Sequence, residues 1–144
     1  MVKPIVEAAM AIRPYLSPTP LLHSPLLSKH FDKSLWLKLE TESPVGSFKA
    51  RGALRCLLER AKQGHRVFTT ASSGNHGMAV AFAGHKLGLR THIFVPKGAS
   101  KRKIALIREY TEDLVLTDCD FDAAKELAAE LAREKGYYFI DDGG

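Results

Sequence analysis

Cysteine is scarce in the chain, because Cys56 and Cys119 are the only two among 144 residues. They lie far apart and belong to no C-x-x-C pair, which excludes the dense disulfide framework of small secreted domains. Isolated cysteines of this type usually behave as small apolar side chains. The sequence therefore predicts two reduced, partly buried thiols.

Long apolar runs are also missing. No stretch of about 18 apolar residues occurs, so the sequence predicts no membrane-spanning helix. Glu7 interrupts the opening segment, which therefore lacks the apolar core of an export signal. Together with the unpaired cysteines, these absences predict a cytoplasmic protein without a membrane partner.

Acidic side chains are outnumbered, with 16 Asp and Glu against 21 Lys and Arg, and the formal net charge is +5. The densest basic cluster consists of Lys97, Lys101, Arg102 and Lys103. Such a cluster could form a nucleic-acid surface or the solvated start of a helix. Because aromatic residues do not interleave with the basic ones, we favour the helix start and expect no nucleic-acid partner.

The spacing of the apolar residues along the chain predicts an α/β fold. After residue 65, short apolar runs alternate with helical patterns, the order that produces a parallel sheet covered by helices. Strands are expected at 66–70, 91–95, 114–116 and 137–140, and helices at 79–87, 100–109 and 121–135. We therefore expect an open, mostly parallel sheet in a three-layer arrangement.

The first part of the chain follows another pattern. A helix is expected at 3–13, a strand at 34–40 and a second helix at 49–62, with a proline-rich extended segment after the first helix. The leucines expected to anchor that segment on the body of the protein are Leu21, Leu22, Leu26 and Leu27. This part of the chain is expected to pack on something other than the later sheet.

A loop of small residues, 71–77, lies between an expected strand and an expected buried helix. Its Ser72-Ser73-Gly74-Asn75 run lets a ligand approach the backbone, and the helix start attracts an anion. The alternative is a simple helix cap by Ser73 or Asn75. His76 is a candidate general base or a side chain that holds the loop, and both interpretations stay open.

Lys49 is the most unusual lysine, because it follows a Gly-Ser-Phe turn at the start of a helix. A cation is unfavourable at the positive end of the helix dipole. The position therefore favours a neutral amine, the form that attacks a carbonyl. Arg51 and Arg55 lie on the same helix and are expected to form salt bridges with nearby glutamates.

Three aspartates, Asp118, Asp120 and Asp122, precede the last expected helix. Alternating carboxylates could bind a hard cation, but no histidine or cysteine cluster lies near them in the sequence. A capped helix start is the preferred interpretation. The sequence therefore predicts no metal site.

Two motifs together resemble a known family. The residues Lys38-Leu39-Glu40, followed by Pro-Val-Gly-Ser-Phe-Lys-Ala-Arg-Gly-Ala at 44–53, resemble the lysine motif of the fold-type II pyridoxal-phosphate enzymes. Within that superfamily the likeness is greatest to the serine/threonine dehydratase and serine racemase group. The likeness continues in Thr19-Pro20-Leu21 with Ser24, in 72–77, and in Phe94-Val95-Pro96 with Lys103.

The resemblance implies the cofactor pyridoxal 5'-phosphate and assigns roles to named residues. Lys49 would form the Schiff base with the cofactor and act as the base at the substrate Cα, where the ring withdraws electrons. Phe48 would pack near the cofactor, and Asn75 would hydrogen-bond its 3-hydroxyl.

The substrate is implied to be a small amino acid. Groups of Ser72, Ser73, Asn75 and His76 would hold its carboxylate, and Ser73 would stand on the opposite face of Cα as a second catalytic proton donor. The resemblance also divides the chain into the N-terminal part of the large domain, 1–48, and the small α/β domain, 49–144. A homodimer or higher oligomer is expected of the full-length enzyme.

The favoured reaction is dehydration and deamination of L-threonine or L-serine to a 2-oxo acid and ammonia. Serine racemisation, threonine-synthase-like chemistry, diaminopropionate ammonia-lyase activity and β-replacement use the same scaffold and remain alternatives. The non-enzymatic alternative is an inactive, truncated α/β binding domain.

The sequence departs from the family in two ways. Members are about twice as long, and their glycine-rich phosphate cradle has no counterpart here, since Gly143-Gly144 is too short. The chain therefore resembles a first half that continues in a larger protein. Asp141-Asp142 after the last expected strand also differs from the dehydratases, which leaves the substrate open.

Overall fold

Four parallel strands form the main sheet, in the order β5-β4-β3-β6. The computed structural model describes residues 2–142, so Gly143 and Gly144 lie outside the described residues. The strands are β3 (Val67–Ala71), β4 (Arg90–Val95), β5 (Leu114–Leu116) and β6 (Tyr138–Phe139). In the register, Phe68 of β3 lies between Thr91 and Tyr138. The predicted open parallel sheet is confirmed.

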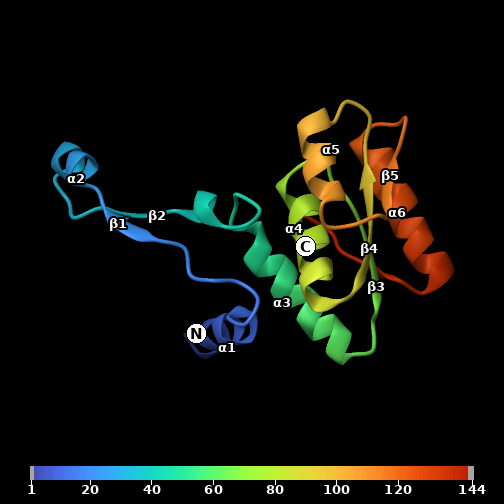
Figure 1. The fold of residues 1–144 in the computed structure, drawn as a ribbon, viewed down its shortest axis with the longest axis horizontal. Helices are drawn as coiled ribbons and strands as arrows, with labels where there is room; N and C mark the ends of the chain where they lie inside the picture. The colour runs from blue at the N-terminus through green and yellow to red at the C-terminus, as the bar shows by residue number, and fades with distance from the viewer. Residues whose placement is uncertain (1, 143–144) are drawn as a thin grey trace.

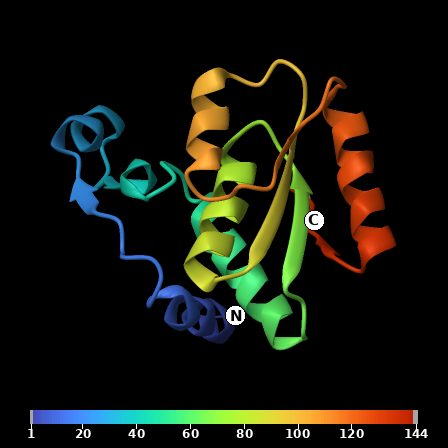
Figure 2. The same ribbon diagram turned by 45° about the vertical axis from the view of Figure 1, so that its right-hand side comes forward.

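Helices cover both faces of this sheet. On one side α6 (Phe121–Lys135) packs against β3 and β4. On the other side lies α4 (Asn75–Leu87), with α5 (Lys101–Arg108) next to it, as Figure 2 shows. The helix α3 (Lys49–Lys62) packs on α4. The arrangement is the predicted three-layer one.

The core lies where α4 meets α3 and the sheet. The side chains of Leu54, Leu57, Phe68 and Phe82 are almost completely buried there. The alanine-rich α4 is buried nearly all round, as its composition predicts. Gly84 permits this close contact, because a Cβ on it would lie 2.9 Å from the Leu89 carbonyl oxygen and closer still to a Thr91 methyl group.

The predicted helix ends are largely confirmed. Ser100 Oγ accepts a hydrogen bond from Lys103 N at the start of α5, and Asp120 Oδ1 accepts one from Ala123 N at the start of α6. Gly88 and Gly136 close α4 and α6 in the left-handed conformation. The four basic residues of the 97–103 cluster are exposed at the start of α5, as predicted.

The N-terminal part is separate from the sheet. Helix α1 (Val2–Ile12) packs on α3. The strands β1 (Leu21–His23) and β2 (Trp36–Lys38) form an antiparallel pair around α2 (Pro25–Phe31). Figure 1 shows this hairpin standing away from the α/β body.

The expectation that the leucines anchor this segment is wrong. Leu21, Leu22 and Leu26 are 56%, 52% and 79% exposed, and Leu27 is half-buried. The two strands are three residues long, pair only with each other in this sheet, and have exposed side chains throughout.

Between residues 2 and 142, no helix is both long and apolar enough to cross a membrane. Over the same range, no group of three or more His, Cys, Asp or Glu side chains is placed to hold a metal ion. Cys56 and Cys119 are partly buried, as predicted.

Candidate active site

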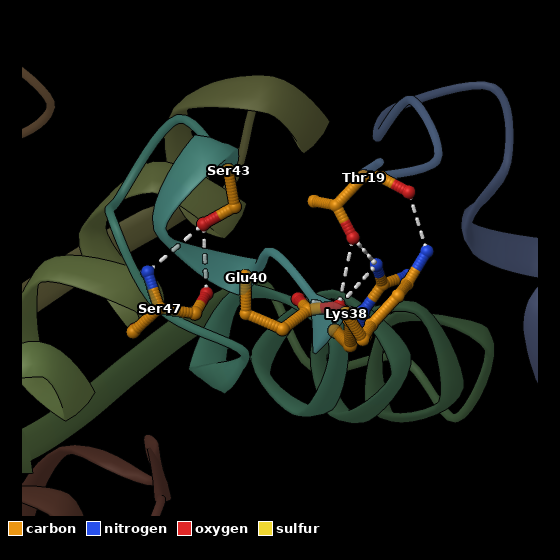
Figure 3. Close-up of polar contacts among 6 residues, drawn as sticks. Thr19, Lys38, Glu40, Ser43 and Ser47 are labelled. Atoms are coloured by element: carbon orange, nitrogen blue, oxygen red, sulfur yellow. Dashed lines mark hydrogen bonds and ion pairs between the residues drawn. The ribbon is translucent and has the colours of Figure 1, made fainter. Parts of the chain in front are cut away.

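A hydrogen-bonded turn presents Lys49. The 3-10 helix η1 (Glu40–Glu42) leads into it, and Ser43 then closes the turn on Ser47. Ser47 N donates to Ser43 Oγ over 2.9 Å, and Ser43 Oγ donates to Ser47 O over 2.8 Å, as Figure 3 shows. Gly46 has a φ of +64°, a conformation that favours glycine. The turn therefore fixes Lys49 as the first residue of α3.

A second polar cluster ties the start of α3 to the preceding segment. Arg51 Nη2 donates to Glu40 Oε1 over 2.8 Å, and Thr19 Oγ1 donates to the same oxygen over 2.9 Å. Lys38 Nζ donates to the Thr19 carbonyl (Figure 3). The hydrogen bond from Arg51 holds the pKa of Glu40 below its ordinary value. The predicted ion pairs of Arg51 and Arg55 are confirmed, the second with Glu59.

Lys49 faces a cleft of about 530 Å³. Its walls come from the exposed side of α3, the first turn of α4 and the chain at and after β6: Phe48, Lys49, Gly52, Ala53, Cys56, Arg60, His76, Tyr138, Phe139, Ile140, Asp141 and Asp142. Phe48 is 62% exposed, and its ring centroid lies 5.9 Å from Lys49 Nζ. An aromatic ring and a primary amine therefore lie next to each other in the lining of the cleft.

Asp142 is a site residue that sequence reasoning missed. Its Oδ1 forms an ion pair with Lys49 Nζ and lies 3.3 Å from His76 Nδ1. The available signal was its position three residues after the end of β6. The carboxyl ends of parallel strands meet at one edge of a sheet, so this residue and the 71–77 loop after β3 had to be neighbours.

His76 is buried beneath this carboxylate. Its Nε2 lies 3.0 Å from Thr70 Oγ1, and Thr70 Oγ1 donates its hydrogen to Ile140 O over 2.8 Å. Burial lowers the pKa of His76 below its ordinary value; the charge of Asp142 acts in the opposite direction, and that of Lys49 adds to the lowering. His76 is therefore mainly neutral near pH 7.

The start of α4 is an uncapped helix end. The N-cap residue is Gly74, with no side-chain cap, so the alternative of a simple cap by Ser73 or Asn75 is wrong. Ser72 Oγ instead accepts a hydrogen bond from Gly74 N over 3.1 Å and shapes the turn. The first backbone N–H groups of α4 therefore keep their capacity to bind an anion. Lys103 adds positive charge, because its Nζ lies 3.8 Å from where a Gly74 Cβ would be.

The predicted site residues fall into two groups. Phe48, Lys49 and His76 line the cleft together. Ser72, Ser73 and Asn75 are not among its lining residues: Ser72 is buried in the turn, Ser73 is half-buried, and Asn75 is exposed in the first turn of α4, which begins earlier than predicted. The two groups are nevertheless adjacent in the chain, because His76, which lines the cleft, directly follows Asn75.

Lys49 is held at a helix start, beside an exposed aromatic ring and a helix end that attracts anions. Such an arrangement is typical of enzymes that bind carbonyl compounds covalently. The family described as pyridoxal-phosphate dependent enzyme matches residues 12–144. The chain therefore belongs to the family of pyridoxal-phosphate-dependent enzymes.

Known relatives agree with this assignment. The chain is 35% identical over 139 residues to the biosynthetic L-threonine dehydratase IlvA of Salmonella typhimurium, covering 95% of this chain and 26% of that protein. It is 34% identical over 137 residues to the serine racemase of Arabidopsis thaliana, covering 94% and 41%. The structure of maize serine racemase matches with a TM-score of 0.87 and 29% identity, covering 97% and 43%. The chain thus spans less than half the length of each of these relatives.

The site fits the aldehyde and ring of the family's cofactor. Lys49 supplies the amine, Phe48 an exposed apolar surface next to it, and the uncapped start of α4 a place for an anionic group. No glycine-rich cradle for the phosphate occurs in the sequence. The residues present therefore account for one part of such a binding site.

Proposed function

We propose that the chain carries the lysine-bearing part of a pyridoxal-phosphate-dependent lyase. The reaction is removal of water and then ammonia from a β-hydroxy amino acid, L-threonine or L-serine, to give a 2-oxo acid. The observation that carries the proposal is Lys49 in the cleft, beside Phe48 and next to the start of α4. When bound, the cofactor supplies an electron sink for the negative charge that develops at the substrate Cα.

The residues of the chain take separate roles in this proposal. Lys49 would hold the cofactor covalently and accept the proton from the substrate Cα, and Phe48 would pack on the ring. Asn75 is exposed at the start of α4 and would hydrogen-bond the cofactor's 3-hydroxyl. The turn of Ser72 and Ser73, with the first N–H groups of α4, holds the substrate carboxylate, because the helix end is uncapped and Lys103 Nζ lies close by.

Addition of pyridoxal phosphate to the purified protein tests this proposal. We expect an absorbance band near the visible edge, lost in Lys49→Ala, and release of 2-oxo acid from threonine or serine. Lys62→Ala is the matched control, since Lys62 is an exposed lysine at the far end of the same helix. If a chain that extends through the length of its relatives shows no band at saturating cofactor, the proposal fails.

Racemisation is the second candidate, and Ser73 is the residue that favours it. Its hydroxyl makes no hydrogen bond to other side chains between residues 2 and 142, and it follows a serine that is fixed in the turn. A free hydroxyl is suited to donate a proton to the second face of Cα. Product analysis with L-serine separates the two reactions, because a racemase releases D-serine and a lyase releases pyruvate.

The proposal includes three further expectations. The division into 1–48 and 49–144 places the antiparallel hairpin with a large domain and the parallel sheet in the small one. A cytoplasmic location and a homodimer or larger assembly are expected of the full-length enzyme. Cell fractionation and size-exclusion chromatography test the last two.

A further inference from the structure

The carboxylate of Asp142 connects the two basic side chains of the cleft. Its Oδ1 contacts Lys49 Nζ and also lies 3.3 Å from His76 Nδ1. The lysine comes from α3, the histidine from α4 and the aspartate from the chain after β6. One oxygen atom is therefore in hydrogen-bonding reach of both nitrogen atoms, from three different elements.

Hydrogen-bond geometry fixes the tautomer of His76. Thr70 Oγ1 has one hydrogen and donates it to the carbonyl oxygen of Ile140 over 2.8 Å. The contact between Thr70 Oγ1 and His76 Nε2, at 3.0 Å, then requires Nε2 to be the donor. In the neutral ring the hydrogen is on Nε2, so Nδ1 carries a lone pair. That lone pair faces Asp142.

Asp142 Oδ1 and the lone pair on His76 Nδ1 are both hydrogen-bond acceptors, so a favourable contact between them needs a proton. We propose that Asp142 and His76 form a relay that takes a proton from the ammonium group of Lys49. This proposal rests on the proposed function, in which Lys49 must become a neutral amine before it attacks a carbonyl. Asp142 and His76 act through Lys49 and are positioning residues in this role.

The proton transfer is balanced. The N–H bond of the Lys49 ammonium breaks as the proton bonds to Asp142 Oδ1, and the same proton then passes to His76 Nδ1. Lys49 ends neutral with a free lone pair, Asp142 ends as a carboxylate, and His76 carries the positive charge. The imidazolium is stabilised by Asp142 at Nδ1 and by Thr70 at Nε2.

The relay needs a driving step, since an amine is ordinarily a stronger base than an imidazole. The ion pair of Lys49 with Asp142 is the arrangement from which the transfer starts. Only Lys49 that has already given its proton to the relay attacks a carbonyl, and this attack consumes the neutral amine and so draws the transfer forward. The charged groups that face His76 are Asp142, Asp141 and Lys49.

Nuclear magnetic resonance of the histidine ring in the cofactor-free protein tests the relay without reference to activity. We expect the ring-nitrogen shifts of neutral His76 to show hydrogen on Nε2 and a lone pair on Nδ1. Asp142→Asn should move the His76 titration to lower pH, because a stabilising negative charge is lost. Lys49→Met should move it to higher pH, because a repelling positive charge is lost. Asp141→Asn is the matched control, with a smaller downward shift expected.

The attachment of pyridoxal phosphate to Lys49 provides the second readout. The rate, followed by absorbance and by mass spectrometry after borohydride reduction, should fall about tenfold or more in His76→Gln near pH 7. If that variant does not fold, the Asp142→Asn titration decides, because Asp142 is partly exposed.

The possible failures are distinguishable. A chain that extends through the length of its relatives and attaches no cofactor at saturating concentration, but shows the expected titration shifts, contradicts the proposed function and leaves the relay supported. Hydrogen on Nδ1 of neutral His76, or an Asp142→Asn titration identical to the wild type, overturns the relay whatever the cofactor does.

Discussion

Arg51 and Glu40 form a bidentate ion pair across the start of the lysine helix. Arg51 Nε lies 3.2 and 3.0 Å from the two carboxylate oxygens, and Nη2 lies 2.8 Å from the first. Because Glu40 belongs to η1 and Arg51 to the first turn of α3, the pair holds the two ends of the Lys49 turn together. The strength of this contact should depend on pH.

Glu40→Gln should reduce the loss of stability in acid. The pKa of Glu40 in the fold is lowered by its hydrogen bond with Arg51, from an ordinary value of 4.5. Its stabilisation is therefore complete above pH 4.5 and is lost as the pH falls through the lower pKa of the folded state. We expect the wild type to lose about 1 kcal/mol more than the variant over this range, a modest value because the pair is partly exposed.

Chemical denaturation at a series of pH values measures this difference. Glu42→Gln is the control, since Glu42 lies in the same 3-10 helix, is exposed, and forms no ion pair within residues 2–142. Its curve should follow that of the wild type. If the free energy of unfolding of Glu40→Gln changes with pH as that of the wild type does, the ion pair does not contribute as described.

Ser43→Ala should loosen the turn that presents Lys49. The substitution removes an acceptor for Ser47 N and a donor to Ser47 O, both in a buried turn. A buried hydrogen-bonding group left without its partner costs about 1–3 kcal/mol, so the free energy of unfolding should fall by that amount. Thermal or urea unfolding measures it.

Ser47→Ala is the matched control and should behave oppositely. Ser47 Oγ is buried and has no hydrogen-bond partner among residues 2–142. Its removal leaves the Ser43 hydrogen bonds intact, because they use the backbone of Ser47. The stability should stay equal or rise by up to about 1 kcal/mol. A larger loss in Ser47→Ala than in Ser43→Ala would contradict this account of the turn.

Local sequence signals predicted most of the fold. The start of α3 at Lys49, the cap at Asp120 and the stops at Gly88 and Gly136 depend on residues within one turn of the helix end. The parallel sheet follows from the alternation of strands and helices. The helix ends were predictable because their physical cause lies within a few residues, and the sheet because its pattern recurs along the chain.

Features that depend on distant parts of the chain were not predictable in the same way. Asp142 becomes a partner of Lys49 because β6 pairs with β3, and the position of Asp142 after a predicted strand does not by itself show which strand is the neighbour. The absence of a cap by Ser73 or Asn75 depends on Ser72 turning inward to Gly74. The roles assigned to Phe48, Lys49, Ser73 and Asn75 toward a cofactor or substrate stay predictions.

Gly84→Ala should destabilise the body of the protein. A Cβ at this position of α4 would lie 2.9 Å from the carbonyl oxygen of Leu89 and closer to a methyl group of Thr91. Overpacking of this kind costs typically about 1–3 kcal/mol. Gly52→Ala is the matched control in α3, because nothing lies within 4 Å of its Cβ position. It should stabilise the helix by up to about 1 kcal/mol, and calorimetry of both variants should show opposite shifts in Tm.

Trp36 should report the unfolding of the β1–β2 hairpin separately from the rest. It is the only tryptophan in the chain, is 57% exposed, and contacts the ring of His23 across the hairpin at a centroid distance of 5.2 Å. A two-stranded hairpin without a covering layer is marginally stable. We therefore expect its fluorescence to change at lower urea concentration than the far-UV circular dichroism, which reports mainly the helices around the parallel sheet. Coincident transitions would show that the hairpin unfolds together with the α/β body, and they would contradict its structural independence.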